Sequence, residues 1–463
     1  MSKLTKYQFS KLYEMTSGIS STKEQAGHGA PFASFSVVFN NYFLPDRLDD
    51  KMNTSIKEQE TFSIKKGDIL ITRTSETIDE LAMSCIALKD YPCATYSGFV
   101  KRLRPLVKGV ADDKYMAFYL RSKLFRKTMT NNASMTLRAS FNEDIFSFLD
   151  LFLPDFNDQI KIGNLLYAIE KKIQLNNKIN ETLQKQASLL YDYWFVQFDF
   201  PNEKGKPYKS SGGKMVYNEV LKREIPEGWE VKSLGKITRK NTTSFDYNST
   251  QPTIDLSVMP SGSISLNQIN SSDEFSTNLF LMNEGDILFG SIRPYLKKAG
   301  IAPCNGAIAG TVHSYRVDNI NNYNFVLFTL SRDSFFEYAV RLSTGTKMPV
   351  VSSDNVLAYK VPYSHSVAKL FSKINIKTII CKNNQETQEL IALRDWLLPM
   401  LMNGQATVAE EQKPIFQVIE NGTKNEQPDR FALWLQNQGL AARGDIDRQT
   451  LREIFDAMDD DDK

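Results

Sequence analysis

The chain has 463 residues and is 41% hydrophobic, which suffices for two or three ordinary domains and excludes a single small one. Its net charge is +2, but the last sixty residues hold 7 basic and 13 acidic side chains, so the rest carries +8 and permits a polyanionic partner without requiring one. Scattered cysteines and histidines argue against a disulfide framework or a metal site, and the lack of any membrane-length apolar run predicts a soluble, cytoplasmic protein without membrane contact.

Residues 1–155 are predicted to form a mostly β domain. Short β-type runs (FASFSVVF, DILITRT, SCIAL and YSGFVKRL) are separated by clusters of Gly, Asn, Asp and Ser. One segment, KYMAFYLRSKLFRKTM, has helical character. A compact domain with few helices follows from this pattern.

Residues 156–200 are predicted to form a long helix. Apolar residues recur at spacings of four and three, as in a coiled coil, and Asn176 and Asn180 fall on the same stripe. We expect these two asparagines to set the register of the seam. The apolar positions of the stripe are Ile162, Leu166, Ile169, Ile173, Leu183, Ala187 and Leu190.

The second half follows the same plan. After a linker, residues 201–228, a second mostly β domain is predicted over residues 229–363, with the runs DILFGSI, AGIAP and VHSYRV. A second helix of about forty residues, 364–404, has a less regular apolar stripe. Residues 405–463 form an acidic tail of unknown role that ends in DDDDK.

Ordered matches between the halves indicate a duplication. Residues 67–70 and 285–288 both read GDIL at an offset of 218, and Pro154 matches Pro362 at 208. The pairs 176–177 and 383–384, both Asn-Asn, match at 207. Slowly drifting offsets are typical of loop insertions within a duplicated unit. The predicted fold is therefore α+β, with two mostly β domains separated by two long helices that pair as an antiparallel coiled coil.

Two further segments carry a resemblance to a known family. The stretch YDYWFVQFDFPNEKGKPYKSSGGKMVYNEVLKREIPEGWEVKSLGKI bridges the halves, and ALRDWLLPMLMNGQ closes the second helix. With the duplicated layout, residues 5–405 resemble the specificity subunit of Type I restriction-modification systems. The resemblance implies that 1–155 and 229–363 are target-recognition domains, each reading one half of a bipartite double-stranded DNA site.

The same resemblance implies which partners and cofactors to expect. Two methyltransferase (modification) subunits would dock on the two helices, and restriction (translocase and nuclease) subunits would complete the complex. The chain itself would be non-catalytic and hold no cofactor, while S-adenosylmethionine, ATP and Mg would belong to the partner subunits. The absence of an Asn/Asp-Pro-Pro-Tyr/Phe tetrapeptide and of an FxGxG loop also argues against methyl transfer by this chain.

Two other functions fit parts of the sequence. Pro154-Asp155 with Glu170 and Lys172 matches the PD…ExK pattern of Mg-dependent nucleases, so a nuclease acting alone is one alternative. That pattern needs its ExK part on a strand, whereas these residues fall within the heptad helix. A coiled-coil scaffold that binds only proteins is the other alternative.

Candidate DNA-binding residues lie at two places in each half, after the GDIL run and before the long helix. Arginine, lysine, hydroxyl and amide side chains there are suited to bases and phosphates, although solvated turns are the alternative interpretation. Candidate partner-docking residues are the aromatic ends of the helices, which core packing would also explain. The DNA-binding candidates are Thr72, Arg73, Thr74, Ser75, Ser134, Thr136, Arg138, Ser291, Arg293, Tyr295, Lys297, Thr346 and Lys347, and the docking candidates are Trp194, Phe195 and Trp396.

Overall fold

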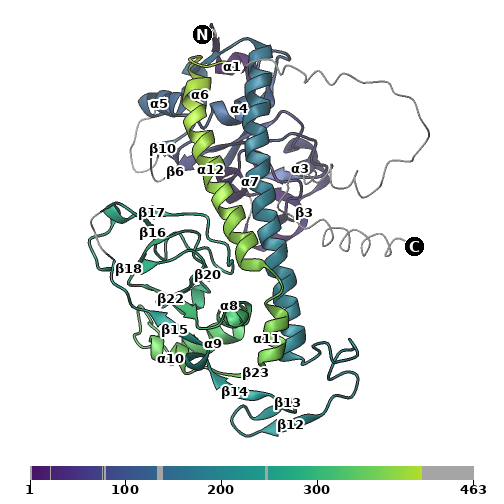
Figure 1. Cartoon of the computed structure of the whole chain (residues 1–463). Coiled ribbons are helices and arrows are strands. Elements are labelled where there is room, and N and C mark those ends of the chain that lie inside the picture. The colour runs from purple at the N-terminus through teal and green to yellow at the C-terminus, as the bar shows by residue number, and fades with distance from the viewer. Residues whose placement is uncertain are drawn as a thin grey trace, which may run out of the picture. The chain divides into compact units, whose positions relative to one another are not determined.

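A computed structural model describes residues 3–408, with gaps at 21, 76, 78–79, 133–138 and 246–248. Within this part of the chain, two β-rich domains pack on two long helices (Figure 1). None of the described helices combines the length and the apolar character needed to cross a bilayer. Most of the predicted acidic tail, from residue 409 onward, lies outside the described residues.

The first domain is built on a four-stranded antiparallel sheet with the order β2-β9-β5-β7. Its central strand β5 (Ile69–Thr72) is the predicted DILIT run, and alternate side chains enter different cores. Ile69 and Ile71 pack with α4 and α5, whereas Leu70 packs with β3 and α2. Both faces of this strand are therefore buried.

The remaining elements of the first domain surround this sheet. A smaller sheet has the order β4-β3-β8, in which β3 and β8 are parallel, and β1 pairs with β11. The bounds are β1 Thr5–Gln8, α1 Phe9–Leu12, β2 Tyr13–Ser17, β3 Ala26–Ala33, α2 Phe35–Asn40, β4 Lys51–Met52, α3 Ile56–Thr61, β6 Thr74–Ser75, β7 Ser84–Ile86, β8 Thr95–Tyr96, β9 Val100–Pro105, α4 Asp113–Tyr119, α5 Lys123–Asn132, β10 Ala139–Ser140, α6 Glu143–Phe148 and β11 Asp150–Leu153.

The second domain has the same arrangement. Its main sheet has the order β15-β22-β19-β20, so the second GDIL strand, β19, occupies the same central place as β5. A smaller sheet, β17-β16-β21-β18, also contains one parallel pair, β16 and β21. The shared strand order is what the sequence repeat predicts.

The bounds of the second domain are β14 Glu230–Ser233, β15 Thr238–Asn241, β16 Pro252–Ile254, β17 Asn270–Ser271, β18 Leu279–Met282, β19 Ile287–Gly290, β20 Ala299–Ile301, β21 Gly306–Ala309, β22 Val312–Val317, α8 Tyr323–Ser331, α9 Asp333–Arg341, α10 Ser353–Leu357 and β23 Lys360–Tyr363. The predicted linker 201–228 is also folded. It contains the hairpin of β12 (Met215–Asn218) and β13 (Arg223–Pro226).

The repeated Gly-Asp pair builds the same turn before both central strands. Gly67 and Gly285 have φ of 85° and 80°, a left-handed conformation that favours glycine. The following Asp68 is fully buried, accepts a hydrogen bond from the Lys65 amide at 2.7 Å, and binds Arg104 at 2.8 and 2.6 Å. This turn-and-arginine unit anchors β5 to β9.

The second domain repeats the unit. Asp286 accepts from the Asn283 amide at 3.0 Å and binds the Arg316 guanidinium through both carboxylate oxygens, at 2.7 and 2.9 Å. Arg316 lies on β22, the equivalent of β9. The GDIL repeat therefore has a structural role, because the aspartate carboxylate of each copy is bound inside its own domain.

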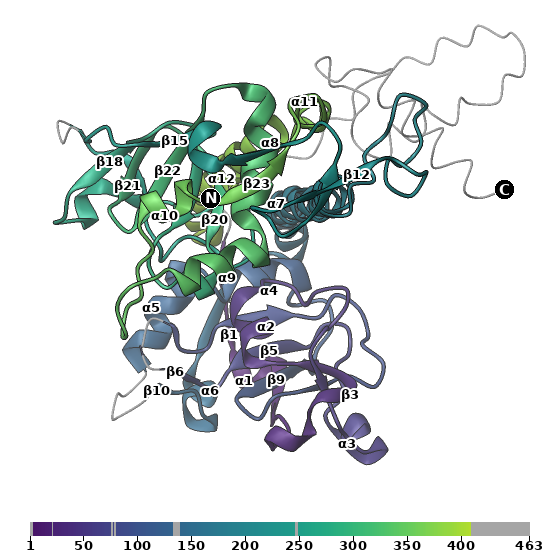
Figure 2. The ribbon, with the colours of Figure 1, turned by 90° about the horizontal axis from the view of Figure 1, so that it is seen from below.

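The two long helices pair in antiparallel orientation. The first, α7 (Phe156–Tyr191), continues as a π-helical turn from Asp192 to Val196. Figure 1 shows α7 and α12 side by side, and Figure 2 views α7 nearly along its axis. Residues later in α7 contact residues earlier in α12: Glu170 binds Arg394, Asn176 contacts Thr387, and Asn180 binds Asn384. The predicted antiparallel pairing is confirmed.

The second helix differs from its prediction as one continuous segment over 364–404. It consists of α11 (His365–Phe371) and α12 (Ile376–Met402), with a break between them. The Asn324 side-chain amide donates to the Phe371 and Ile374 carbonyls at 3.0 and 2.8 Å. These two bonds satisfy carbonyls that the end of a helix leaves unpaired, which explains why the break is tolerated.

Each helix contributes to the cores of both domains. Near its start α7 places Ile162 and Leu166 in the first core, and near its end it places Ala187 and Tyr191 in the second. The two ends of α12 do the reverse, with Ile376, Ile380 and Cys381 in the second core and Leu398, Leu401 and Met402 in the first. The helices are therefore integral parts of both domains.

The buried Asp68–Arg104 pair should be important for the stability of the first domain. We expect Asp68→Ala to lower the free energy of unfolding of this domain by about 3 kcal/mol, because it leaves a largely buried guanidinium and a turn amide without their acceptor. Urea denaturation measures the change. Asp150→Ala, which removes the exposed Lys6–Asp150 pair, should cost less than about 1 kcal/mol. Equal losses for both variants would contradict this role of the pair.

Candidate nucleic-acid interface

The two candidate segments of each half, predicted separately, lie against each other in the structure. In the first domain β6 pairs with β10, and the Arg73 carbonyl accepts from the Phe141 amide at 2.8 Å. In the second domain Ile292 bridges to Val350, and the Ser291 carbonyl accepts from the Val351 amide at 3.0 Å. Each domain therefore has one composite surface at the end of its central strand.

In the first domain this surface exposes Arg73. Thr74 and Ser75 in β6 are half-buried, so part of each side chain is accessible. Thr72 is fully buried, and its hydroxyl accepts a hydrogen bond from the Met83 amide at 2.9 Å. The expectation that Thr72 contacts DNA is corrected, because its side chain points into the domain. Ser134, Thr136 and Arg138 lie outside the described residues.

In the second domain the exposed candidates lie in the turn between Thr344 and Val350, whose backbones bond at 2.9 Å in both directions. Thr346 and Lys347 are exposed at its tip. Ser291, by contrast, is 2% exposed and donates its hydroxyl to the Thr311 carbonyl at 2.9 Å. It is therefore a structural residue in this conformation, and the prediction of DNA contact at Ser291 is corrected.

A strained loop presents Tyr295. Arg293 and Lys297 both adopt left-handed backbone conformations, with φ of 50° and 53°, on either side of the 3-10 turn Pro294–Leu296. Such strain persists only where surrounding contacts hold it. The Arg293 amide donates to the Pro349 carbonyl at 2.7 Å, and the Lys297 ammonium binds Asp333 at 2.7 Å. Tyr295 is 53% exposed at the tip of this loop.

Arg293 and Lys297 thus differ from freely solvated side chains. The Nε atom of Arg293 is buried and has no hydrogen-bond partner within the described structure. Such a donor is costly to leave unpaired, so a ligand that accepts a hydrogen bond would be stabilised there. Lys297 already has a carboxylate partner and is less available.

The two composite surfaces differ in charge. Lys101 on β9 is buried and donates to the Ser17 hydroxyl at 2.9 Å, while its burial and the nearby Arg73 lower its pKa. The equivalent residue on β22 is His313, whose pKa falls to about 4 because of burial and the charge of Lys240. At this strand position the first domain therefore has a basic group close to Arg73, whereas the second domain has an imidazole that is neutral at neutral pH.

The docking candidates separate into core and surface residues. Phe195 is 2% exposed and packs on Phe325 with ring centroids 4.8 Å apart, so its assignment as a docking residue is wrong. Trp194 is half-buried against Phe371 at 5.9 Å. Trp396 on α12 is 64% exposed and is the accessible member of the predicted set.

The nuclease-like residues are used in helix pairing. Glu170 binds Arg394 at 3.0 Å, and Lys172 binds Glu386 at 3.1 Å. Asp155 lies at the start of the same helix, fifteen residues before Glu170. This separation corresponds to about 22 Å along the helix axis. These carboxylates cannot share one metal ion. The described residues also contain no cluster of three or more His, Cys, Asp or Glu side chains suited to a metal.

The chain matches known proteins over most of its length. The family model for the Type I restriction modification DNA specificity domain matches residues 12–185. The Type I restriction enzyme MjaIX specificity subunit of Methanocaldococcus jannaschii is 24% identical over 379 residues, which cover 77% of this chain and 81% of that protein. The HindI specificity subunit of Haemophilus influenzae is 22% identical over 454 residues, covering 81% and 94%. Residues 12–185 therefore match a Type I restriction modification DNA specificity domain, and the chain as a whole is similar to Type I restriction enzyme specificity subunits.

A solved structure shares the fold of this chain. The crystal structure of the Type-I restriction-modification system S subunit from M. genitalium aligns with a TM-score of 0.53 and 16% identity. The alignment covers 86% of this chain and 96% of that one. The two chains therefore share a fold, and the low identity carries no residue role from that structure to this chain.

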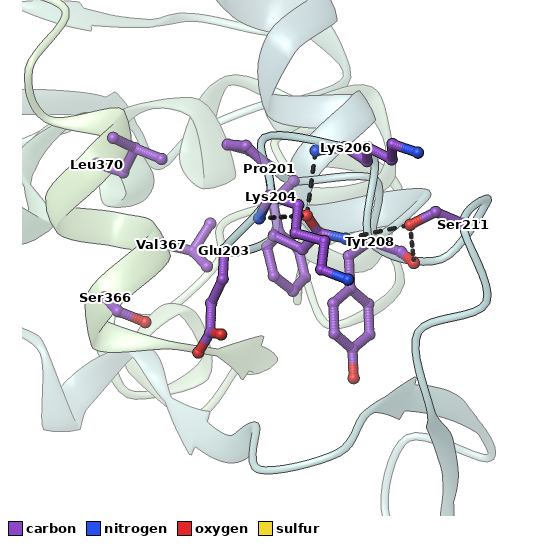
Figure 3. A pocket seen from close by; sticks show the side chains of 11 residues that line it. Pro201, Glu203, Lys204, Lys206, Tyr208, Ser211, Ser366, Val367 and Leu370 are labelled. Atoms are coloured by element: carbon purple, nitrogen blue, oxygen red, sulfur yellow. Dashed lines mark hydrogen bonds between the residues drawn. The ribbon is translucent and has the colours of Figure 1, made fainter.

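The chain also has a groove beside α11, formed by the segment that follows α7 (Figure 3). The groove has a volume of about 630 Å³, and Val367 and Leu370 of α11 face Glu203 and Lys204 across it. Asn202 orders the loop by accepting hydrogen bonds from the amides of residues 204 and 206 at 2.9 and 3.1 Å. Its lining contains no histidine or cysteine that could serve as a base or nucleophile.

The exposed basic residues should contribute unequally to DNA affinity. We expect Arg73→Ala to weaken binding of a cognate duplex by about 1–3 kcal/mol if Arg73 contacts a guanine, with little change on scrambled DNA. A phosphate contact would instead weaken both duplexes and reduce the salt slope by about one. Titrations of the assembled complex at two salt concentrations distinguish these roles, and Arg293→Ala and Lys347→Ala are measured in the same way.

Arg47→Ala serves as the control, because Arg47 is an exposed arginine of the first domain whose side chain pairs with Asp49 away from the composite surface. It should leave affinity and salt slope unchanged. If Arg73, Arg293 and Lys347 all behave like Arg47, the composite surfaces are not the DNA interface.

Proposed function

We propose that this specificity subunit binds double-stranded DNA at a bipartite site and that each domain reads one half-site. The observation that carries the proposal is that two copies of one sheet present different side chains at equivalent positions. Arg73 and Phe99 end the first sheet, whereas Ser291 and Thr311 occupy these places in the second. A common scaffold with different exposed chemistry is suited to reading two different sequences.

The exposed residues fit such a task. Arginine binds guanine or phosphate through two parallel hydrogen bonds, and hydroxyl groups accept or donate to several bases. The first surface offers Arg73 with Thr74 and Ser75, and the second offers Tyr295, Thr346 and Lys347. The hydrogen-bonded backbone beneath both surfaces reduces the entropy lost on binding.

The catalytic steps are proposed to belong to partner subunits. The chain lacks the sequence motifs for methyl transfer, so two methyltransferase subunits would hold S-adenosylmethionine, and restriction subunits would hold ATP and Mg. In this proposal the chain is non-catalytic and selects the DNA on which its partners act. A cytoplasmic location belongs to the same proposal, because the DNA is there.

Two equivalent apolar positions support docking of two identical partners. Leu189 on α7 is 70% exposed and Trp396 on α12 is 64% exposed, and their separation of 207 residues is the offset that relates the two helices. Exposed apolar residues at matched positions are typical of interface centres. Neighbouring exposed apolar residues on the same helices are Leu175, Ile179, Tyr193, Ile379 and Leu393.

The division of labour can be tested by exchanging a domain. Replacing residues 1–154 with the corresponding domain of a relative should change one half of the methylated motif and leave the other half and its methylation unchanged. Methylation-sensitive sequencing of DNA modified by the assembled complex provides the measurement. A change in both halves would show that the domains do not read independently.

Partner docking can be tested at the two matched positions. We expect Trp396→Ala and Leu189→Ala each to weaken binding of one methyltransferase copy by about 2 kcal/mol, as is usual for interface hot spots. Native mass spectrometry of each complex should then show a larger share with one copy bound, and the double variant should bind neither copy tightly. Ile320→Ala removes a side chain that is 63% exposed on the second domain and should have no effect. Unchanged stoichiometry in the double variant would contradict docking on these helices.

A further inference from the structure

Phe99 is an exposed aromatic residue at the end of the first sheet. Its side chain is 62% exposed, although aromatic side chains are usually buried. It lies in the turn between β8 and β9, immediately before Val100. Burying such a ring against a partner would remove apolar surface from water and so favour binding.

The turn that carries Phe99 is held by several hydrogen bonds. The Gly98 amide donates to the Ile19 carbonyl at 2.7 Å, the Phe99 amide donates to the Ser97 hydroxyl at 3.2 Å, and the Val100 amide donates to the Ser97 carbonyl at 2.9 Å. The ring is therefore presented from an ordered backbone, which reduces the entropic cost of binding.

Phe99 lies directly across from Arg73. The register of β5 and β9 pairs Ile71 with Lys101 and Thr72 with Val100, and the Arg73 amide donates to the Phe99 carbonyl at 2.8 Å. Directly paired residues have Cβ atoms about 5 Å apart on the same face of a sheet. Arg73 and Phe99 are therefore backbone neighbours where β5 ends and β9 begins, and both side chains are exposed there.

The charges around this pair favour a polyanion. Lys101 lies on the same face, and in the part of the chain that the structure describes Arg73 has no carboxylate or side-chain hydrogen-bond partner. Burial and the charge of Arg73 lower the pKa of Lys101. The carboxylate of Glu143 raises the same pKa and so partly offsets these two effects. An arginine left unpaired beside an exposed ring is suited to a base edge, which offers a hydrogen-bond acceptor and an apolar group side by side.

We propose that Phe99 and Arg73 together read two neighbouring base pairs in the first half-site, with Phe99 contacting the C5 methyl group of a thymine. The inference rests on the proposed function and names a specificity residue within it. Phenylalanine makes apolar contacts with thymine methyl groups in the major groove, and arginine binds guanine there.

The second domain provides an internal comparison. Its equivalent pair is Ser291 and Thr311, since the Ser291 amide donates to the Thr311 carbonyl at 3.0 Å as Arg73 does to Phe99. Ser291 is buried, so this position lacks both the ring and the cation. The thymine contact is therefore specific to the first half-site, and Phe99→Ala should leave reading of the second half-site unchanged.

The test uses the full chain assembled with its methyltransferase subunits. Motif sequencing should show that Phe99→Ala loses the preference for thymine at one position of the first half-site. Affinity for the cognate duplex should fall about tenfold, within the usual effect of one mismatched base pair. Replacing that thymine with deoxyuridine, which lacks only the methyl group, should lower wild-type affinity by a similar factor and have no further effect on the variant.

Phe148→Ala is the matched control, because Phe148 is 77% exposed at the end of α6 in the same domain. It should leave the motif and the affinity unchanged. The inference is overturned if Phe99→Ala keeps the motif, if it weakens all sequences equally, if deoxyuridine has no effect on the wild type, or if the first half-site has no thymine. A wild-type complex that modifies no bipartite motif would instead refute the proposed function itself.

Discussion

The antiparallel pairing of α7 and α12 is the constraint on which the rest of the structure depends. Asn176 and Asn180 are buried in the seam, where Asn180 binds Asn384 at 3.0 Å and Asn176 contacts Thr387 at 3.4 Å. A buried amide without a partner costs about 1–3 kcal/mol, so sliding one helix along the other is unfavourable. Because both helices also contribute to both cores, this register determines where each domain begins and ends.

Near the centre of the seam, the contacts between α7 and α12 recur at equivalent positions of the sequence repeat. Asn176 and Asn383 are equivalent at an offset of 207, as are Asn180 and Thr387. Asn176 contacts Thr387, and the equivalent positions Asn383 and Asn180 contact each other in turn. The two hydrogen bonds are therefore related by the repeat. Away from this centre the symmetry is lost, since Glu170 binds Arg394 in one half whereas the equivalent positions hold Lys377 and Ala187.

Within each domain, scaffold and reading residues are separated along a single strand. The strand begins with an aspartate that binds an arginine inside the fold, and it ends at a surface whose side chains differ between the halves. Changes at that end do not disturb the buried pair. This separation would allow one fold to be duplicated and its copies to present different exposed side chains, because the buried aspartate–arginine pair lies at the other end of the strand.

Several features were determined by the sequence alone, because they rest on local periodicity. The duplicated GDIL runs and the seam from Ile162 to Ala187 can be counted along the chain, and the alternation of two β domains with two long helices predicted the antiparallel pairing. The family resemblance added the function, because its signature segments lie in the helices and the connection between them.

Only the tertiary structure decided which polar and aromatic residues are accessible. Thr72, Ser291 and Phe195 look like surface candidates in the sequence, yet each is buried by elements far away in the chain. The partners of Arg73 and Asp68 could not be predicted either, since Phe99 and Arg104 reach them only after β5 and β9 pair. Spacing along a chain determines the face of an element on which a residue lies, but burial depends on what packs against that face.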